Sequence, residues 1–171
     1  RKPTSVTAAS NSSSPNDDRH AIMSASFTLR PYTADDEDAA IDLWHRTWQQ
    51  AYPSIDFTQR LEGWRARWHN ELVPIAQIVV AERDGAMSGF VTIDSSGYLD
   101  QLVVAPETWG SDLGNLLIAQ AKTMSPSGIT LLVNTDNARA IRFYERNGFV
   151  HTHDDVNPVS GRKVYGMAWK P

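Results

Sequence analysis

Apolar residues gather in short runs through the middle of the chain. The runs 78–81, 89–93 and 98–104 are rich in Val, Ile, Leu and Phe, and the turn sequences Asp84-Gly85 and Ser96-Gly97 separate them. Runs of this length bounded by glycine turns are typical of strands joined as tight hairpins. The pattern therefore predicts an antiparallel meander of three strands.

Helical spacing governs the region before this meander. Apolar residues recur three and four positions apart up to Pro53, and again over residues 58–71. This period gathers apolar side chains on one face of a helix. The sequence therefore predicts two helices, with the stripes Ile41, Trp44 and Trp48 in the first and Leu61, Trp64 and Trp68 in the second.

The first of these helices has a complete start signal. Thr33 followed by Asp36 is a capping-box pattern, in which the two side chains satisfy free N–H groups of the backbone. The acidic run 35–38 then lies at the positive end of the helix dipole. We interpret the run as structural rather than as a catalytic or metal site.

The second half of the chain predicts a helix, a strand, a second helix and a hairpin. Ser111 or Asp112 can cap the first helix, and Asn147-Gly148 closes the second in the left-handed conformation. With a short strand at 27–30, the element order is β-α-α-β-β-β-α-β-α-β-β. This order predicts an α/β (α+β) fold with one mixed, mostly antiparallel sheet of about seven strands and helices on both faces. The first helix is predicted to run through residues 116–121 and to end before 125–128, and the remaining predicted ranges are 129–133, 137–146, 149–153 and 163–169.

Composition and charge exclude several classes of protein. The chain has 171 residues, of which 41% are hydrophobic and 21% charged, as in one soluble globular domain. The net charge of −4 argues against a nucleic-acid partner, and no apolar run approaches the ~18 residues of a membrane span. The absence of cysteine excludes disulfides and cysteine nucleophiles, and it fits the reducing cytoplasm, where we expect the protein.

The N-terminal segment differs from the rest of the chain. Residues 1–22 are rich in Ser, Asn, Thr and Asp, lack the apolar stretch of a secretory signal, and precede Met23. So polar a segment buries too little surface to offset its ordering entropy. We therefore expect 1–26 to be a flexible tail or extension, and 27–171 to be a single domain.

The turn after Val104 has the properties of an anion site. Gly110 and Gly114 punctuate the connection between a strand and a helix start. A helix N-terminus presents unpaired N–H groups and a partial positive charge, and glycine lets a phosphate approach the backbone closely. A strand-to-helix turn can also contain glycine for steric reasons alone, so both interpretations stay open.

The segment 137–149 carries the most specific pattern. It reads N-x-x-A-x-x-F-Y-x-x-x-G-F and, with the turn after Val104, resembles the GNAT superfamily of acyl-CoA-dependent N-acyltransferases. The resemblance implies direct acetyl transfer from acetyl-CoA to a primary amine in a ternary complex, without a metal. It implies that Tyr144 is the general acid that protonates the CoA thiolate, and that Asn137 caps its helix and contacts the cofactor. A phenol with a pKa near 10 is protonated at neutral pH and suits this role.

The resemblance also assigns the donor site. The family pattern Gln/Arg-x-x-Gly-x-Gly/Ala falls on Trp109, Asp112 and Gly114, so the first two positions depart from it. The preceding strand is implied to pair with the pantetheine arm through its backbone. The implied cofactor-binding residues are Leu102, Val103, Val104, Trp109, Gly110, Ser111, Asp112, Leu113, Gly114, Asn115, Asn137 and Tyr144.

Asp100 is the candidate general base. Period-two alternation puts Tyr98, Asp100, Leu102 and Val104 on one strand face, with Gln101 on the other. A partly desolvated carboxylate close to the implied cofactor could take a proton from a substrate ammonium, directly or through water. An aspartate at an exposed strand edge is the structural alternative.

Two aromatic residues and two histidines complete the candidates. The helices that carry the tryptophans help cover the acceptor site in the implied family, which makes Trp48 and Tyr52 candidate substrate contacts, although tryptophans four apart are usually core. His151 and His153 alternate along a strand, where we expect surface residues rather than zinc ligands.

The acceptor stays open among small-molecule and peptide amines, and no feature decides whether the protein forms a homodimer. The departures at Trp109 and Asp112 motivate an alternative of another class, a CoA-binding module without catalysis that acts as a sensor or in assembly. A third option is acyl transfer to tRNA-linked amino acids, against which the acidic balance argues.

Overall fold

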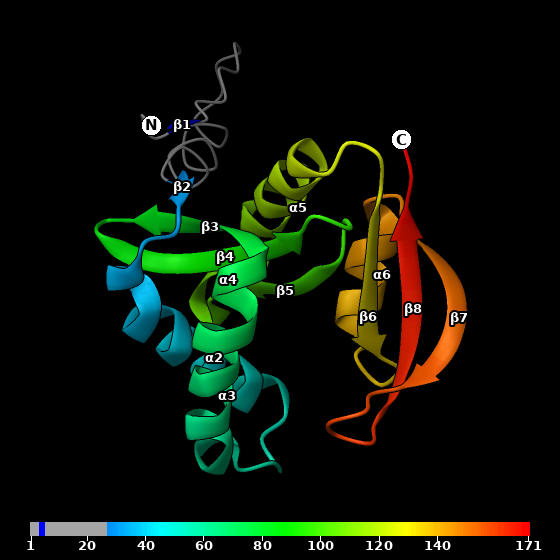
Figure 1. Ribbon diagram of the computed structural model, residues 1–171, viewed down its shortest axis with the longest axis horizontal. Helices are drawn as coiled ribbons and strands as arrows, with labels where there is room; N and C mark the ends of the chain where they lie inside the picture. Colours follow the sequence, from blue (N-terminus) through cyan, green and yellow to red (C-terminus); the bar gives the residue numbers. More distant parts are fainter. Residues whose placement is uncertain (1–3, 6–26) are drawn as a thin grey trace, which may run out of the picture.

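The computed structural model describes residues 4–5 and 27–171, and it contains two antiparallel sheets with flanking helices (Figure 1). The larger sheet has the order β1-β2-β3-β4-β5, and the smaller sheet has the order β6-β8-β7. The strands of the larger sheet are β1 (Thr4–Ser5), β2 (Thr28–Pro31), β3 (Ala76–Arg83), β4 (Ala86–Asp94) and β5 (Leu99–Val104). Those of the smaller sheet are β6 (Ile129–Asn134), β7 (Val150–Val156) and β8 (Lys163–Trp169).

The helices follow the predicted order. They are α2 (Glu37–Ala51), α3 (Leu61–Arg67), α4 (Val73–Ile75), α5 (Leu113–Met124) and α6 (Ala138–Arg146). A π-helical turn, Trp68–Leu72, joins α3 to α4, so the second predicted helix runs on past its expected end at residue 71. Apart from β1, the predicted tail 1–26 lies outside the described residues. Among the residues that are described, no helix is both long and apolar enough to cross a membrane.

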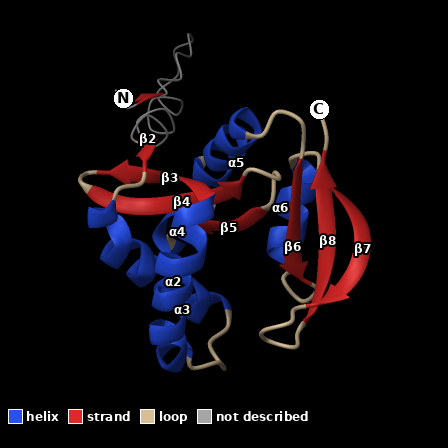
Figure 2. Cartoon of the chain, viewed as in Figure 1, coloured by secondary structure: helices blue, strands red, loops and turns tan. Residues whose placement is uncertain are grey.

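The two sheets meet at a single point. Tyr98 forms an isolated parallel bridge with Thr130, whose N–H donates to Gly97 O at 3.0 Å. Beyond this bridge β5 and β6 run in the same sense and belong to different sheets, which separate in Figure 2. The predicted fold class is confirmed, but the prediction of one continuous sheet is wrong because β5 and β6 pair only where they begin.

Side-chain alternation builds a core on each face of the larger sheet. Val79 and Val91 pack with α5 in a core that continues into the smaller sheet, which we call the α5-side core. Val80 and Phe90 pack with α2 and α3 in the α2-side core. Successive residues of a strand point to opposite faces, so neighbouring positions of β3 and β4 serve different cores. The larger sheet is therefore covered on both faces, as expected.

The tryptophans of the first two helices belong to the α2-side core. Trp44 stacks on Trp64 with ring centroids 4.6 Å apart, and Trp68 is fully buried. Their interpretation as core residues is confirmed. This packing fixes α2 and α3 on the sheet face opposite α5.

The capping pattern at the start of α2 is also present. The Thr33 N–H donates to Asp36 Oδ2 at 2.8 Å, and Arg30 donates to both oxygens of the same carboxylate at 2.7 and 2.8 Å. Hydrogen bonds from Arg30 are the main reason that the pKa of Asp36 is lowered. Arg30 also binds Glu82, which anchors the helix start to β3. The structural interpretation therefore accounts for Asp36.

Candidate functional site

One extra residue in β5 changes the faces that its side chains occupy. Thr92 of β4 pairs with Gln101, but the next β4 residue, Ile93, pairs with Leu99. Asp100 is therefore left without a partner across the ladder. A bulge of this kind breaks the regular alternation of side chains.

The prediction that Tyr98, Asp100, Leu102 and Val104 share one strand face is consequently wrong. Leu102 and Val104 pack against the α5-side core, whereas Asp100 reaches Arg67 of α3 on the opposite face. The bulge arises from the register with β4, and period-two alternation along β5 alone contains no sign of it.

Asp100 is half of an ion pair. Arg67 donates from Nη1 to Oδ1 at 3.1 Å and from Nη2 to Oδ2 at 2.6 Å, and Gln101 Nε2 donates to Oδ1 at 3.0 Å. Burial alone would lower the pKa of the Arg67 guanidinium, but its hydrogen bonds to Asp100 offset this and raise the pKa above its usual value. The carboxylate side chain is 16% exposed, so it is partly desolvated as expected, but its charge is already paired.

The outer edge of β5 faces the gap between the sheets. The Ala105 N–H donates to Ser88 O of the β4 side at 2.8 Å. In an antiparallel pair, main-chain groups alternate in direction, so those of Leu102 and Val104 point away from β4. No described strand pairs with this edge beyond the Tyr98 bridge. The side chain of Val103 is buried in the α2-side core.

Residues 109–115, which we call the amide loop, connect this edge to α5. Gly110 has a φ of +85°, a value that favours glycine, and no atom lies within 4 Å of its hypothetical Cβ. Within 110–115 the N–H of Ser111 donates to Thr108 O and that of Leu113 to Ser111 Oγ. The other four N–H groups of this described segment have no protein acceptor, and they belong to Gly110, Asp112, Gly114 and Asn115.

The Asp112 side chain does not occupy these amides. Its Oδ1 accepts a hydrogen bond from Asn115 Nδ2 at 3.1 Å, and its φ of −80° does not require glycine. Asp112 therefore lies at the N-cap position of α5 without a capping hydrogen bond from its side chain, and Ser111 is the residue of the predicted pair whose side chain accepts from the helix start. The departure from glycine at Asp112 leaves the backbone unstrained.

Gly114 is explained by packing as well. A Cβ at this position would lie 3.0 Å from Cε2 of Phe143. The close approach of α5 to α6 therefore leaves little room for a Cβ here, whereas the space beside Gly110 is open. The steric interpretation holds for Gly114, and its N–H remains without an acceptor.

One stripe of α6 faces the amide loop. Arg139, Phe143 and Asn147 are spaced four residues apart and contact, in order, Trp109, Gly114 and Asn115. The helix begins at Asn137, whose side chain accepts from the Ala140 N–H at 3.2 Å, as predicted for its cap. The two segments singled out by their motifs, 109–115 and 137–149, are thus side by side.

Tyr144 lies on the buried side of α6. It packs in the α5-side core, with its ring edge-to-face against Phe143 and Phe149 at centroid distances of 5.2 and 5.4 Å. Leu102 and Val104 pack against the same core. Burial raises the pKa of the Tyr144 phenol well above its usual value, so the group carries its proton at neutral pH. Within the described chain the hydroxyl has no hydrogen-bond partner.

Tyr52 connects the end of α2 to the smaller sheet. Its hydroxyl donates to Asp136 Oδ1 at 3.0 Å and accepts from Asn134 Nδ2 at 3.3 Å, and Arg162 lies 4.3 Å from its ring centroid. Its ring also stacks on Trp48, with centroids 5.7 Å apart. The two candidate substrate contacts therefore lie where the end of α2 meets the smaller sheet.

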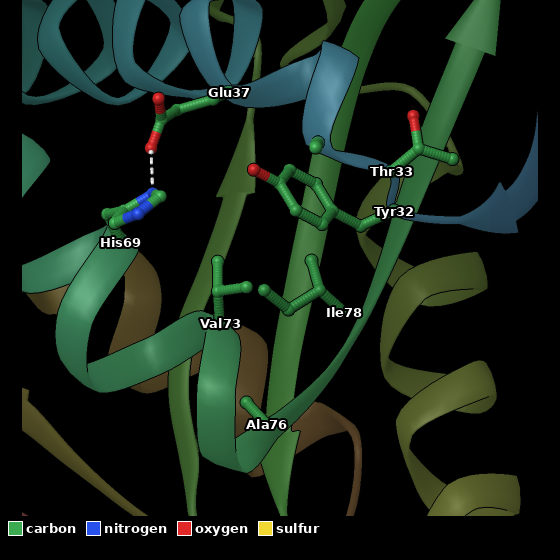
Figure 3. A pocket seen from close by; sticks show the side chains of 8 residues that line it. Tyr32, Thr33, Glu37, His69, Val73, Ala76 and Ile78 are labelled. Atoms are coloured by element: carbon green, nitrogen blue, oxygen red, sulfur yellow. Dashed lines mark hydrogen bonds and ion pairs between the residues drawn. The ribbon is translucent and has the colours of Figure 1, made fainter.

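A separate pocket of about 390 Å³ opens on the side of β2 and β3, away from β5. Figure 3 shows an apolar floor that includes Val73 and Ile78, with the Tyr32 hydroxyl turned toward the Glu37–His69 pair, whose Oε1 and Nδ1 atoms are 3.1 Å apart. None of the residues predicted from the sequence as a functional site lines it. In the sheet order, β4 lies between β3, which lines this pocket, and β5.

Two functional candidates were not predicted individually. Arg67 is 33 residues from Asp100 in sequence, and no spacing pattern links the pair. Arg139 occupies an unspecified position of the pattern at 137–149, so the motif did not single it out. The histidines of β7 are exposed, and His151 binds Asp154 at 2.8 Å. Among the residues that the structure describes, no group of three His, Asp or Glu side chains could hold a metal.

Comparison with known sequences identifies the family to which the segment containing the amide loop and α6 belongs. Residues 46–171 match the family model described as an acetyltransferase (GNAT) domain. The peptidyl-lysine N-acetyltransferase YjaB of Salmonella typhimurium is 27% identical over 146 residues, which cover 85% of this chain and 92% of the relative. The mycothiol acetyltransferase of Acidimicrobium ferrooxidans is 32% identical, over 77% of this chain and 45% of the relative.

Solved structures share the fold. The PaiA N-acetyltransferase of Thermoplasma acidophilum in complex with coenzyme A superposes with a TM-score of 0.70 at 20% identity, over 85% of this chain and 99% of that one. The apo form of YjaB from Escherichia coli gives a TM-score of 0.69 at 22% identity, over 84% of this chain and 97% of that one.

Proposed function

The chain belongs to the GNAT acetyltransferase family and is an acyltransferase, and from this premise we propose that it transfers an acetyl group from acetyl-CoA to a primary amine by direct attack in a ternary complex. Relatives named as peptidyl-lysine N-acetyltransferases support a peptide or small-molecule amine as the acceptor.

The observation that carries this proposal is the set of unclaimed amides beside an unpaired strand edge. The free N–H groups of Gly110, Asp112, Gly114 and Asn115 suit a diphosphate, because a helix N-terminus favours negative charge. Val104 O on the outer edge of β5 already accepts from Trp109 Nε1, but the main-chain groups of Leu102 on the same edge suit an extended amide chain, which can hydrogen-bond to them as a strand does. Pyrophosphate and pantetheine are joined in this order in coenzyme A, so the residues fit this substrate.

Two chemical roles follow for the chain's own side chains. The substrate nitrogen forms a bond to the thioester carbonyl carbon, and the bond from that carbon to sulfur breaks. We assign the proton that the ammonium loses to a water held by Asp100, whose Oδ2 accepts one hydrogen bond from Arg67 and retains a second acceptor position. Tyr144 gives its phenolic proton to the departing thiolate. Acid–base help of this kind contributes about 10²–10⁴-fold.

The phenol at Tyr144 gives the most direct test. In Tyr144→Phe we expect kcat for CoA release to fall about 10²–10⁴-fold, measured with a thiol reagent over a panel of amines, while KM for acetyl-CoA changes little. Because burial raises its pKa, this acid should stay protonated past pH 10 (about the usual value), so no alkaline loss of activity below that pH should trace to it.

Tyr165→Phe is the matched control, because it removes a tyrosine hydroxyl from β8, where the ring packs on His151. Its kcat should equal that of the parent chain. Tight acetyl-CoA binding without turnover on any acceptor would favour the non-catalytic module instead. An absence of acetyl-CoA binding would overturn the donor site itself.

A further inference from the structure

Trp109 stands where the family pattern expects Gln or Arg, and its ring is held in place. The indole Nε1 donates to Val104 O at 2.9 Å, which closes the amide loop back onto the end of β5. The guanidinium carbon of Arg139 lies 3.9 Å from the centroid of this ring. A guanidinium at this distance from an indole is held by a cation–π interaction. Trp109, the first residue of the amide loop, thus contacts a cation that α6 supplies.

Arg139 has no anionic partner within the described chain. Five other arginines bind carboxylates, and these are Arg30, Arg46, Arg65, Arg67 and Arg162. Arg139 forms neither a hydrogen bond nor an ion pair with any described residue, so all five of its N–H donors are available. Partial burial lowers the pKa of the guanidinium, yet an arginine remains charged at neutral pH.

The stacked geometry suits phosphate recognition. Stacking uses the face of the guanidinium and leaves its N–H groups in the plane, where they can donate to two oxygens of one phosphate. On the same helix stripe, Phe143 and Asn147 fix α6 against Gly114 and Asn115. The cation is therefore carried by a helix that packs against the segment with the four unclaimed amides.

We propose that Arg139, stacked on Trp109, is the phosphate-binding cation of the donor site, supplied by α6 because the amide loop itself has no Gln or Arg at position 109. The inference rests on the proposed function and deepens it. The ligand group is a phosphate of coenzyme A, either in the pyrophosphate or at the ribose 3′ position. Without this side chain the amide loop would bind the donor through backbone groups alone.

Three donors of decreasing phosphate content test the proposal, namely acetyl-CoA, acetyl-3′-dephospho-CoA and acetyl-pantetheine. In Arg139→Gln, KM for acetyl-CoA should rise about 10- to 100-fold, the value of a charged hydrogen bond, while KM for acetyl-pantetheine stays within about twofold. A rise with the dephospho donor as well assigns the pyrophosphate, and a rise with acetyl-CoA alone assigns the 3′-phosphate. Both outcomes support the proposal.

Arg60→Gln is the matched control. The Arg60 guanidinium also lies over an aromatic ring, 5.2 Å from the Phe57 centroid, and has no carboxylate partner in the described residues. This variant should leave all three KM values unchanged. Arg139→Lys retains the charge but not the planar fork, so it should recover only part of the affinity for acetyl-CoA. The thermal unfolding midpoint of each variant reports whether the fold is intact.

Two results would overturn the inference while leaving the proposed function standing. One is a parent-like KM for acetyl-CoA in Arg139→Gln. The other is an equal rise for acetyl-CoA and acetyl-pantetheine, which would show that Arg139 only supports the fold of the loop. If the parent chain neither binds nor turns over acetyl-CoA, as measured by calorimetry, the proposed function fails and this inference fails with it.

Discussion

Two helix N-termini of this chain carry the same partial positive charge and are satisfied in opposite ways. At the start of α2, Asp36 accepts from the Thr33 N–H and is bound by Arg30. The backbone donor and the charge of the carboxylate are therefore both paired within the chain. At the start of α5, four N–H groups have no acceptor, and the Asp112 carboxylate accepts from the Asn115 side chain instead.

The difference separates a structural helix end from a binding one. Folding itself fills the site at α2, because the anion is part of the chain and 8% exposed. At α5 the donors stay available, and the nearby cation, Arg139, lacks an anion too. At α2 a carboxylate of the acidic run therefore fills the helix end, whereas at α5 the Asp112 carboxylate is bound to a side chain and leaves the N–H groups for a ligand.

The largest effect should come from removing the Asp36 carboxylate at the start of α2. Asp36→Ala removes the acceptor of the Thr33 N–H and one of the two carboxylates that bind Arg30, and we expect the free energy of unfolding to fall by about 3 kcal/mol in urea titrations. The control Asp38→Ala removes a 91% exposed carboxylate and should change stability by less than about 1 kcal/mol. A similar loss in both variants would contradict the comparison.

Acid should neutralise the same Asp36 carboxylate without a mutation, with a smaller loss of stability. The pKa of Asp36 is lowered in the folded state, so its contribution is fully present above the usual value of about 4 and is lost as the pH falls through the lowered pKa. Unfolding measured from about pH 6 down to about pH 2 should show this loss. In Asp36→Asn that component should be absent, and an unchanged acid profile would refute the assignment.

Distorting the open end should weaken donor binding in addition to its cost in stability. Gly110→Ala forces a side chain to φ +85°, at a strain of about 1–2 kcal/mol. The amides should turn away, and the affinity for acetyl-CoA measured by calorimetry should fall about tenfold. Gly85→Ala introduces the same strain at φ +76° in the β3–β4 turn, and it should leave this affinity intact.

The smallest effect should come from removing the carboxylate at the open end. Asp112→Asn takes a negative charge away from a site proposed for phosphates, so the affinity for acetyl-CoA should rise about two- to fivefold. Asp38→Asn removes the same charge at the start of α2 and should change nothing in this assay. A weaker affinity in Asp112→Asn would show that the carboxylate supports the loop.

The sequence predicted those elements whose signals are local. The turns at Asp84-Gly85 and Ser96-Gly97, the cap at Asn137 and the helical spacing of the tryptophans each involve residues a few positions apart. Their outcomes are confirmed because local periodicity and backbone conformation depend on little else.

Features that depend on pairing between residues far apart in the sequence could not be predicted from local patterns. The bulge at Asp100 is a property of the register between β4 and β5, and the separation of the sheets depends on where β5 and β6 stop pairing. For the same reason the sequence named Asp100 as a candidate but gave no indication of Arg67, and it showed Trp109 as a departure without showing Arg139 against it.

The single bridge between Tyr98 and Thr130 has a mechanical consequence. Because backbone pairing between described residues joins the two sheets only there, side-chain contacts supply the rest of the connection, including the α5-side core and the hydrogen bonds of Tyr52 with Asp136 and Asn134. A ligand bound along the gap between β5 and β6 would connect the two sheets over its whole length. We therefore expect the loaded enzyme to be stiffer than the empty one, with slower amide exchange in β5 and β6.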